Sequence, residues 1–98
     1  MEDIRGLLHL ARKAGKLVLG QTAVLEKFKN GTELLILITS DAGQVLLRKF
    51  RDIEFINIRM TSDELGEVFN REKLSVLAVS DKNFSDEIKK RLNAQDEI

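Results

Sequence analysis

Residues 13–31, KAGKLVLGQTAVLEKFKNG, and the apolar run LLILI at 34–38 decide the fold. The first stretch holds a glycine turn at Gly15, a short apolar segment at 17–19, and a second glycine, Gly20, in front of a helical pattern. The run at 34–38 is apolar at every position, which is typical of a central strand covered by helices on both faces. Together the two stretches predict a short strand, a helix and a buried strand in succession.

The rest of the chain also alternates between helical and strand patterns, with further strands expected at 53–58 and 74–79. The residues expected to face the core from the helices are Ile4, Leu7, Leu8 and Ala11; Val24, Leu25 and Phe28; Val45, Leu46 and Phe50; Leu65, Val68 and Phe69; and Phe84, Ile88 and Leu92. This alternation predicts a single α/β domain over 1–98, a three-layer α/β/α sandwich on a small, largely parallel or mixed sheet, with a frayed tail at 93–98.

Polar residues mark the expected starts of three helices. Thr61, with Glu64 three residues later, has the spacing of a capping box. Asp41 and Asp81 each follow a strand and a serine, and each is expected to cap the next helix. The alternative is a paired-acid metal site of a phosphate-handling enzyme, since ligands gather at the carboxyl ends of strands in open α/β sheets. No third acid or partnering lysine stands at a suitable spacing, so capping is the favoured interpretation.

Composition excludes several classes of protein. The sixteen basic and sixteen acidic residues cancel, which excludes a globally basic nucleic-acid binder. The balance is uneven, because residues 1–51 have a net charge of +4 and residues 52–98 one of −4, so a basic N-terminal face remains. The chain has no cysteine, its single histidine has no second metal ligand, and no apolar run approaches the ~20 residues of a membrane span. We therefore expect a cytoplasmic protein with no metal and no membrane contact.

The glycine pair Gly15 and Gly20 invites comparison with a phosphate-binding loop of nucleotide-binding enzymes. In such a loop the second glycine is followed by Lys and then Ser or Thr, whereas Gln21 and Thr22 stand at these positions. The two glycines also flank an expected strand instead of one tight loop. Neither a dinucleotide fingerprint nor a nucleophile motif occurs elsewhere. The sequence therefore predicts no cofactor, no small-molecule substrate and no catalytic residue.

Basic and polar residues gather around the helix that follows Gly20. A helix N-terminus with free amides is a ready anion site, and neighbouring lysines favour a phosphodiester backbone. The residues of this set are Lys13, Gly15, Lys16, Gly20, Gln21, Thr22 and Lys27. A solvated charged face is the simpler interpretation of such a lysine set. The pattern alone leaves both interpretations open.

A resemblance favours the first of these. The string LLHLARKAGKLVLGQTAVLEKFKNGTELLILITSDA at 7–42 resembles the superfamily of ribosomal proteins that bind kink-turn RNA, of the L7Ae/L30e type, and within it the small bacterial branch known as YlxQ. The likeness continues through the ELG at 64–66 and the LAVSD at 77–81, so it covers nearly the whole chain. It implies an α/β/α sandwich with a four-stranded mixed sheet, and RNA binding without catalysis.

The resemblance also implies where RNA is held: on the glycine turn, on the first turns of the following helix, and on the loop before the last strand. Here the last of these is roughly 70–74, where Arg71 and Lys73 are expected to reach phosphates. The implied partner is a structured ribosomal or regulatory RNA, with the ribosome as a candidate place of action.

The chain departs from the family pattern on the groove-facing side of that helix. Strong kink-turn binders carry Asn or Lys, then Glu or Gln, and a later Lys, whereas Thr22, Ala23 and Glu26 stand here. Ala23 has no polar group to read a base, and Glu26 repels phosphate. Each lost base contact costs ~1–3 kcal/mol. The alternative function is therefore a protein-interaction adaptor that keeps the fold and has lost high-affinity RNA recognition.

Overall fold

The structure is a computed structural model that describes residues 4–96, and of residues 94–96 the backbone only. Its elements, in chain order, are α1 (Arg5–Lys13), β1 (Leu17–Leu19), α2 (Gln21–Lys29), β2 (Leu35–Ile38), α3 (Gln44–Lys49), β3 (Ile56–Asn57), α4 (Ser62–Val68), β4 (Val76–Val79) and α5 (Lys82–Asp96). Helices and strands alternate along the chain, as the sequence pattern predicts.

The four strands of the described residues form one mixed sheet in the order β1-β4-β2-β3. Strand β4 is antiparallel to both of its neighbours, and β2 and β3 are parallel. Leu77 lies opposite Leu19 on one side and opposite Leu37 on the other. The last strand of the chain is thus inserted between the first two, and the predicted mixed sheet is confirmed.

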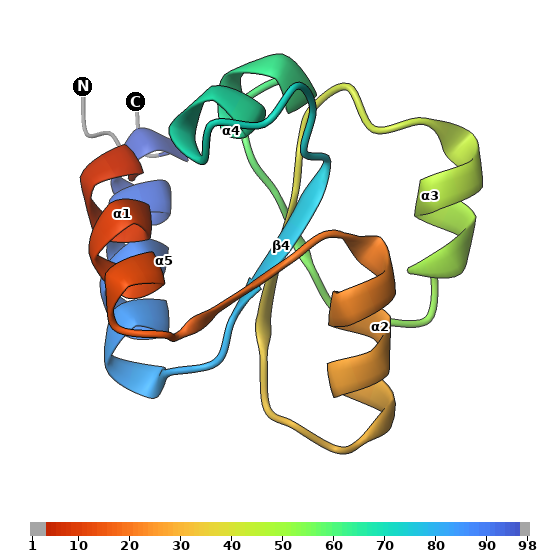
Figure 1. The fold of residues 1–98 in the computed structure, drawn as a ribbon, viewed down its shortest axis with the longest axis horizontal. Helices are drawn as coiled ribbons and strands as arrows, with labels where there is room; N and C mark the ends of the chain where they lie inside the picture. The colour runs from red at the N-terminus through yellow and green to blue at the C-terminus, as the bar shows by residue number, and fades with distance from the viewer. Residues whose placement is uncertain (1–3, 97–98) are drawn as a thin grey trace.

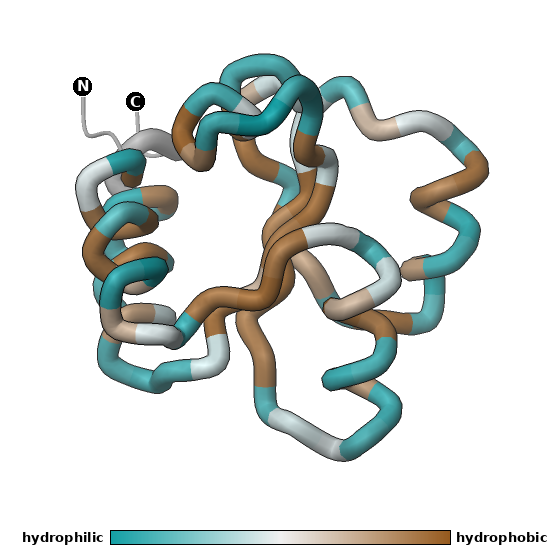
Figure 2. Tube along the Cα trace, viewed as in Figure 1, coloured by the Kyte–Doolittle hydropathy of each residue, from teal (hydrophilic) through white to brown (hydrophobic). Residues whose placement is uncertain are grey.

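Helices cover both faces of this sheet, which gives three layers (Figure 1). Because side chains alternate along a strand, Leu35 and Leu37 of β2 pack in one cluster with residues of α1, α4 and α5, and Ile36 and Ile38 pack in the other with residues of α2 and α3. Figure 2 shows hydrophobic residues along the central strands and hydrophilic residues on the outer turns of the helices. The predicted α/β/α sandwich is confirmed.

The strand predicted at 53–58 is much shorter, because β3 is only Ile56–Asn57. The chain after α3 is still turning there, and the Ile53 amide donates to the Phe50 carbonyl over 3.0 Å. Phe55 then packs with the α2 and α3 cluster. The first half of the apolar run is therefore used by a turn and by core contacts instead of by strand pairing.

Two residues predicted to face the core do not. Val45 is 68% exposed, whereas Phe50 is buried as predicted and Leu46 and Leu47 pack against the same cluster. Phe28, in the last turn of α2, is 42% exposed. Of the predicted frayed tail, residues 93–96 belong to α5, and residues 97–98 lie outside the described part of the chain.

Phe50 and Val45 lie on the same short helical segment in opposite environments, which gives a matched test of the core. Replacing Phe50, which has no exposed surface, by alanine is expected to lower the free energy of unfolding by ~3–5 kcal/mol, through lost apolar burial and the cavity left behind. Replacing Val45 by alanine is expected to change it by ~0.5 kcal/mol or less. Urea unfolding followed by circular dichroism measures both, and equal losses contradict the assignment of the buried face.

Candidate nucleic-acid interface

Helix α2 begins at a glycine in a conformation that other residues rarely adopt. Gly20 has φ 90° and ψ 153°, its amide donates to the Val76 carbonyl over 2.9 Å, and its carbonyl accepts from Val24 over 3.0 Å. Glycine has no side chain with which to cap the helix. The amides of residues 21–23 have no acceptor four residues earlier in the helix. They form an N-terminus suited to an anion.

The loop between α4 and β4 is held against α4 by backbone hydrogen bonds. The Arg71 amide donates to the Gly66 carbonyl over 2.9 Å, and the Leu74 amide donates to the Ser62 carbonyl over 3.0 Å. A Cβ atom on Gly66 would lie 2.8 Å from the Arg71 carbonyl oxygen, so only glycine allows this approach. Asn70 turns the chain with a φ of 59°, in the left-handed region that asparagine tolerates. These backbone contacts fix the path of the loop that carries Arg71 and Lys73.

The start of β4 brings this loop and the start of α2 to one end of the sheet. The Gly20 amide bonds to Val76 on one edge of β4, and the Thr39 amide bonds to the Ser75 carbonyl on the other edge over 2.9 Å. The predicted site residues Gly20, Gln21 and Thr22 therefore lie at the same end as Arg71 and Lys73, both of which are exposed. We call this set the α2–loop site.

The remaining predicted residues lie elsewhere. Lys13, Gly15 and Lys16 surround the α1–β1 turn, where the Lys16 carbonyl accepts from the Ser80 amide over 2.9 Å. This turn is at the opposite end of β1 from Gly20, about 13 Å away at the rise of an extended chain. Lys27 is in the last turn of α2, about 9 Å along the helix axis from its start. The sequence set is thus divided between one end of the sheet and two outlying positions.

Gln21 has a feature that the sequence does not reveal. Its Oε1 atom is buried, and no hydrogen-bond donor among the described residues reaches it. Thr22 and Glu26 are exposed on the same helix, and Ala23 is half-buried. A buried acceptor without a donor is uncommon in a folded protein, because the group loses its bonds to water without replacing them.

Asp41 has a different role from the predicted one. Helix α3 begins after Gly43, without a side-chain cap, and the Asp41 carboxylate instead accepts from the Ser62 amide over 2.8 Å and from the Ser62 hydroxyl over 2.9 Å. It therefore binds the β2–α3 turn to the first turn of α4. The Ser62 hydroxyl is the main cause that lowers the pKa of Asp41 below its ordinary value of 3.8, although desolvation acts in the opposite direction.

Asp81 caps α5 as predicted, because its carboxylate accepts from the Phe84 amide over 2.9 Å. The paired-acid site with Asp41 is wrong for a geometric reason. Asp41 follows β2 and Asp81 follows β4, and these strands are antiparallel neighbours. Their carboxyl ends are at opposite ends of the sheet. Among the side chains that the structure describes, residues 4–93, no group of three or more His, Asp or Glu is arranged to hold a metal.

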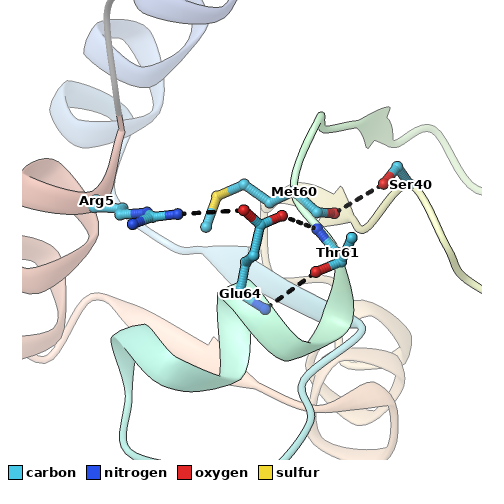
Figure 3. Close-up of polar contacts among 5 residues, drawn as sticks. All are labelled: Arg5, Ser40, Met60, Thr61 and Glu64. Atoms are coloured by element: carbon cyan, nitrogen blue, oxygen red, sulfur yellow. Dashed lines mark hydrogen bonds and ion pairs between the residues drawn. The ribbon is translucent and has the colours of Figure 1, made fainter.

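The start of α4 is held by further polar contacts (Figure 3). The predicted capping box is confirmed: the Glu64 amide donates to Thr61 Oγ1 over 3.2 Å, and the Thr61 amide donates to Glu64 Oε1 over 2.9 Å. Arg5 of α1 lies 3.6 Å from the same carboxylate. The amide and the hydroxyl of Ser40 both donate hydrogen bonds to the Met60 carbonyl. These contacts position α4, and through it the loop that carries Arg71.

The chain is similar in sequence to proteins that are already known. The sequence pattern of the Ribosomal protein L7Ae/L30e/S12e/Gadd45 family matches residues 2–89. The chain belongs to this family. It is 30% identical over 87 residues to the RNA-binding protein YlxQ of Bacillus subtilis (strain 168). The matched region covers 84% of this chain and 87% of the relative.

Solved structures of similar fold extend the comparison. A protein of unknown function from Bacillus halodurans C superposes with a TM-score of 0.81 at 25% identity, over 95% of this chain and 99% of the other. The Giardia lamblia 15.5kD RNA binding protein superposes with a TM-score of 0.64 at 17% identity, over 93% and 85%. The family fold is thus shared over nearly the whole chain. No helix of the described residues is long and apolar enough to cross a membrane.

Gly66 and Gly6 provide a matched pair that tests the close approach of the loop. A methyl group on Gly66 collides with backbone, so Gly66→Ala is expected to destabilise the protein by ~1–3 kcal/mol and to shift the amide resonances of residues 70–74. A methyl group on Gly6 of α1 meets nothing within 4 Å. Gly6→Ala is expected to stabilise the protein by up to ~1 kcal/mol through helix propensity. Thermal unfolding and amide NMR spectra measure both effects, and a silent Gly66→Ala contradicts the structure of the loop.

Asp41→Asn tests the bond to α4 through its pH dependence. A carboxylate whose pKa is lowered in the folded state stabilises it fully above the unfolded value of 3.8, and this contribution is lost as the pH falls through the folded pKa. The variant is expected to melt at a lower temperature than the wild type from pH 5 to 8, with a gap that closes below pH 3.8. Asp52→Asn, at an exposed position, is the control that leaves the melting temperature unchanged. A gap independent of pH refutes the role of the ionised carboxylate.

Proposed function

We propose that this protein is a non-catalytic RNA-binding protein of the ribosomal type, which recognises a structured, kink-turn-like RNA through the α2–loop site. Membership of the family supports this function, as does the relative from Bacillus subtilis, which is named an RNA-binding protein. The observation that carries the proposal is the meeting of an uncapped helix N-terminus, at the start of β4, with a loop that exposes Arg71 and Lys73 on either side of Glu72. The proposed place of action is the cytoplasm, on ribosomal or regulatory RNA.

The chemistry of the α2–loop site fits a bent RNA. The amides of residues 21–23 and the side chains of Arg71 and Lys73 offer donors and positive charge to phosphates on two sides of a bend. Bases that are unstacked at a bend expose donor groups on their edges. The exposed Thr22 hydroxyl is available to such a base, and a rotation of the Gln21 side chain would bring its buried, unpaired Oε1 atom within reach of a base N–H.

The outlying residues have a secondary part in this proposal. Lys16 is about 13 Å from Gly20 along β1, and Lys13 ends α1 on the far side of the same turn, so neither is placed at the phosphates bound by the α2–loop site. We assign them, with Gly15 and Lys27, to the RNA segments that leave the bend. Their contribution is electrostatic and therefore sensitive to salt.

A second candidate function is a protein-interaction adaptor. The exposed Glu26 on α2 favours it, because a carboxylate on the helix that starts at the α2–loop site repels the phosphates of an RNA lying along that helix. Under this alternative the fold is retained and the affinity for RNA is lost. The experiment below separates the two candidates.

The test is a binding titration with a kink-turn RNA and a straight duplex of equal length, each at two salt concentrations. We expect the kink-turn RNA to bind at least about tenfold more tightly, or ~1.4 kcal/mol. Arg71→Ala is expected to weaken this binding by about fivefold or more and to reduce its salt slope by about one. Lys16→Ala has a smaller effect, and Lys89→Ala on the exposed surface of α5 has none.

Either of two results contradicts the proposal. Equal affinity for the bent and the straight RNA leaves only non-specific binding. Equal losses from Arg71→Ala and Lys89→Ala show that RNA binds without a defined site. In both cases a partner whose capture survives nuclease treatment supports the adaptor.

A further inference from the structure

The edge of the sheet at the start of β2 is open. Strand β3 pairs with β2 only at Leu37 and Ile38, opposite Ile56 and Asn57. Before Ile56 the chain does not continue as a strand. The first half of β2 therefore has β4 on one side and no strand on the other.

A backbone donor faces this open edge. Thr39 bonds to Ser75 across the antiparallel pair, so alternate residues, among them Leu35 and Leu37, point their amides toward β4. The Ile36 amide points the other way. Among the described residues the hydrogen bonds of the structure include no acceptor for it. Ile36 is only 2% exposed, so this unpaired donor is reached from within the hollow that Ile36 lines and not from the open surface. An unpaired backbone donor of this kind pairs with an added strand.

A hollow of about 310 Å³ lies at this edge. Its apolar lining includes Leu34, Ile36 and Phe55, together with Phe28, a residue that is 42% exposed. Lys89 of α5 lines it from the other layer. Phe28, which was predicted to face the core, thus offers an exposed aromatic side chain in the same hollow as the unpaired Ile36 amide.

Carboxylates outnumber ammonium groups by two to one in the lining of this hollow. Glu33 and Glu54 line it, and a second hollow that shares Glu33, Leu34, Leu35 and Lys89 with it is lined in addition by polar residues at the start of α5. The charged side chains around the two hollows are four carboxylates and two ammonium groups: Glu33, Glu54, Asp81, Asp86, Lys82 and Lys89. The excess of negative charge favours a basic occupant and disfavours RNA.

We propose that this edge is a docking site for an extended segment of a partner protein in which apolar residues alternate with Lys or Arg. The segment adds a strand beside Leu34–Ile36 and accepts a hydrogen bond from the Ile36 amide. Its apolar side chains pack on Phe28 and Phe55, and its basic side chains meet Glu33 and Glu54. Backbone pairing supplies affinity and the alternating side chains supply specificity, as in other strand-addition complexes.

This edge is remote from the α2–loop site. It lies where β2 starts and α2 ends, whereas the α2–loop site lies where β2 ends and α2 starts (Figure 1). The separation along α2 is about 13 Å. A partner segment and an RNA therefore do not compete for the same surface, and the inference stands whether or not RNA binding is confirmed.

The test uses the full chain and two synthetic peptides, each acetylated and amidated: one of alternating valine and arginine, and one of alternating valine and glutamate. The basic peptide is expected to shift the amide resonances of Phe28, Ile36 and Phe55 and to slow hydrogen exchange at Ile36. The acidic peptide is expected to bind at least tenfold more weakly. Phe28→Ser is expected to weaken the basic peptide at least fivefold, whereas Val45→Ser, at another exposed apolar position, leaves it unchanged.

A charge variant covers the case in which Phe28→Ser fails to fold. Glu33→Lys combined with Glu54→Lys changes exposed side chains and is expected to reverse the preference between the two peptides. Equal binding of both peptides to the wild type overturns the proposal. So do shifts confined to residues 70–76, or a concentration-dependent dimer that Phe28→Ser abolishes, because the occupant would then be a second copy of this chain.

Discussion

Strand β4 is bound along both of its edges, and the rest of the molecule depends on this double pairing. Its antiparallel bonds to β1 and β2 place Gly20 on one side of its first residues and Thr39 on the other. The start of α2, the α4–β4 loop and the β2–α3 turn therefore meet at one end of the sheet. The α1–β1 turn and the start of α5 meet at the other end.

Local sequence patterns predict the elements of this fold well. The fully apolar runs at β2 and β4, the glycine turns and the capping box at Thr61 all report environments that a few neighbouring residues determine. The predicted extent of the strand at 53–58 is wrong, because the environment of these residues is not determined by their neighbours in sequence. Its apolar residues are divided between the two faces of the core, and hydropathy alone does not distinguish a strand from an irregular segment whose side chains are buried.

The candidate site is harder to predict, because it depends on which strands are antiparallel. Residues close in sequence, such as Lys16 and Gly20, are separated by the length of β1. Residues far apart, such as Thr22 and Arg71, come to one end of the sheet through β4. The bond from Asp41 to Ser62 joins residues 21 positions apart and leaves no local pattern, whereas the cap by Asp81 spans three and was predicted correctly.

The order of the strands also has a consequence for biosynthesis. The sheet cannot close until β4 has been made, because β1 and β2 each require it as a partner, and β1 is separated from it by most of the chain. Pairing over such a sequence distance is slow. A nascent chain that has not yet added β4 has an unpaired β1 and no strand to bring the α4–β4 loop beside the start of α2. The α2–loop site is therefore assembled only after the chain has been made through β4.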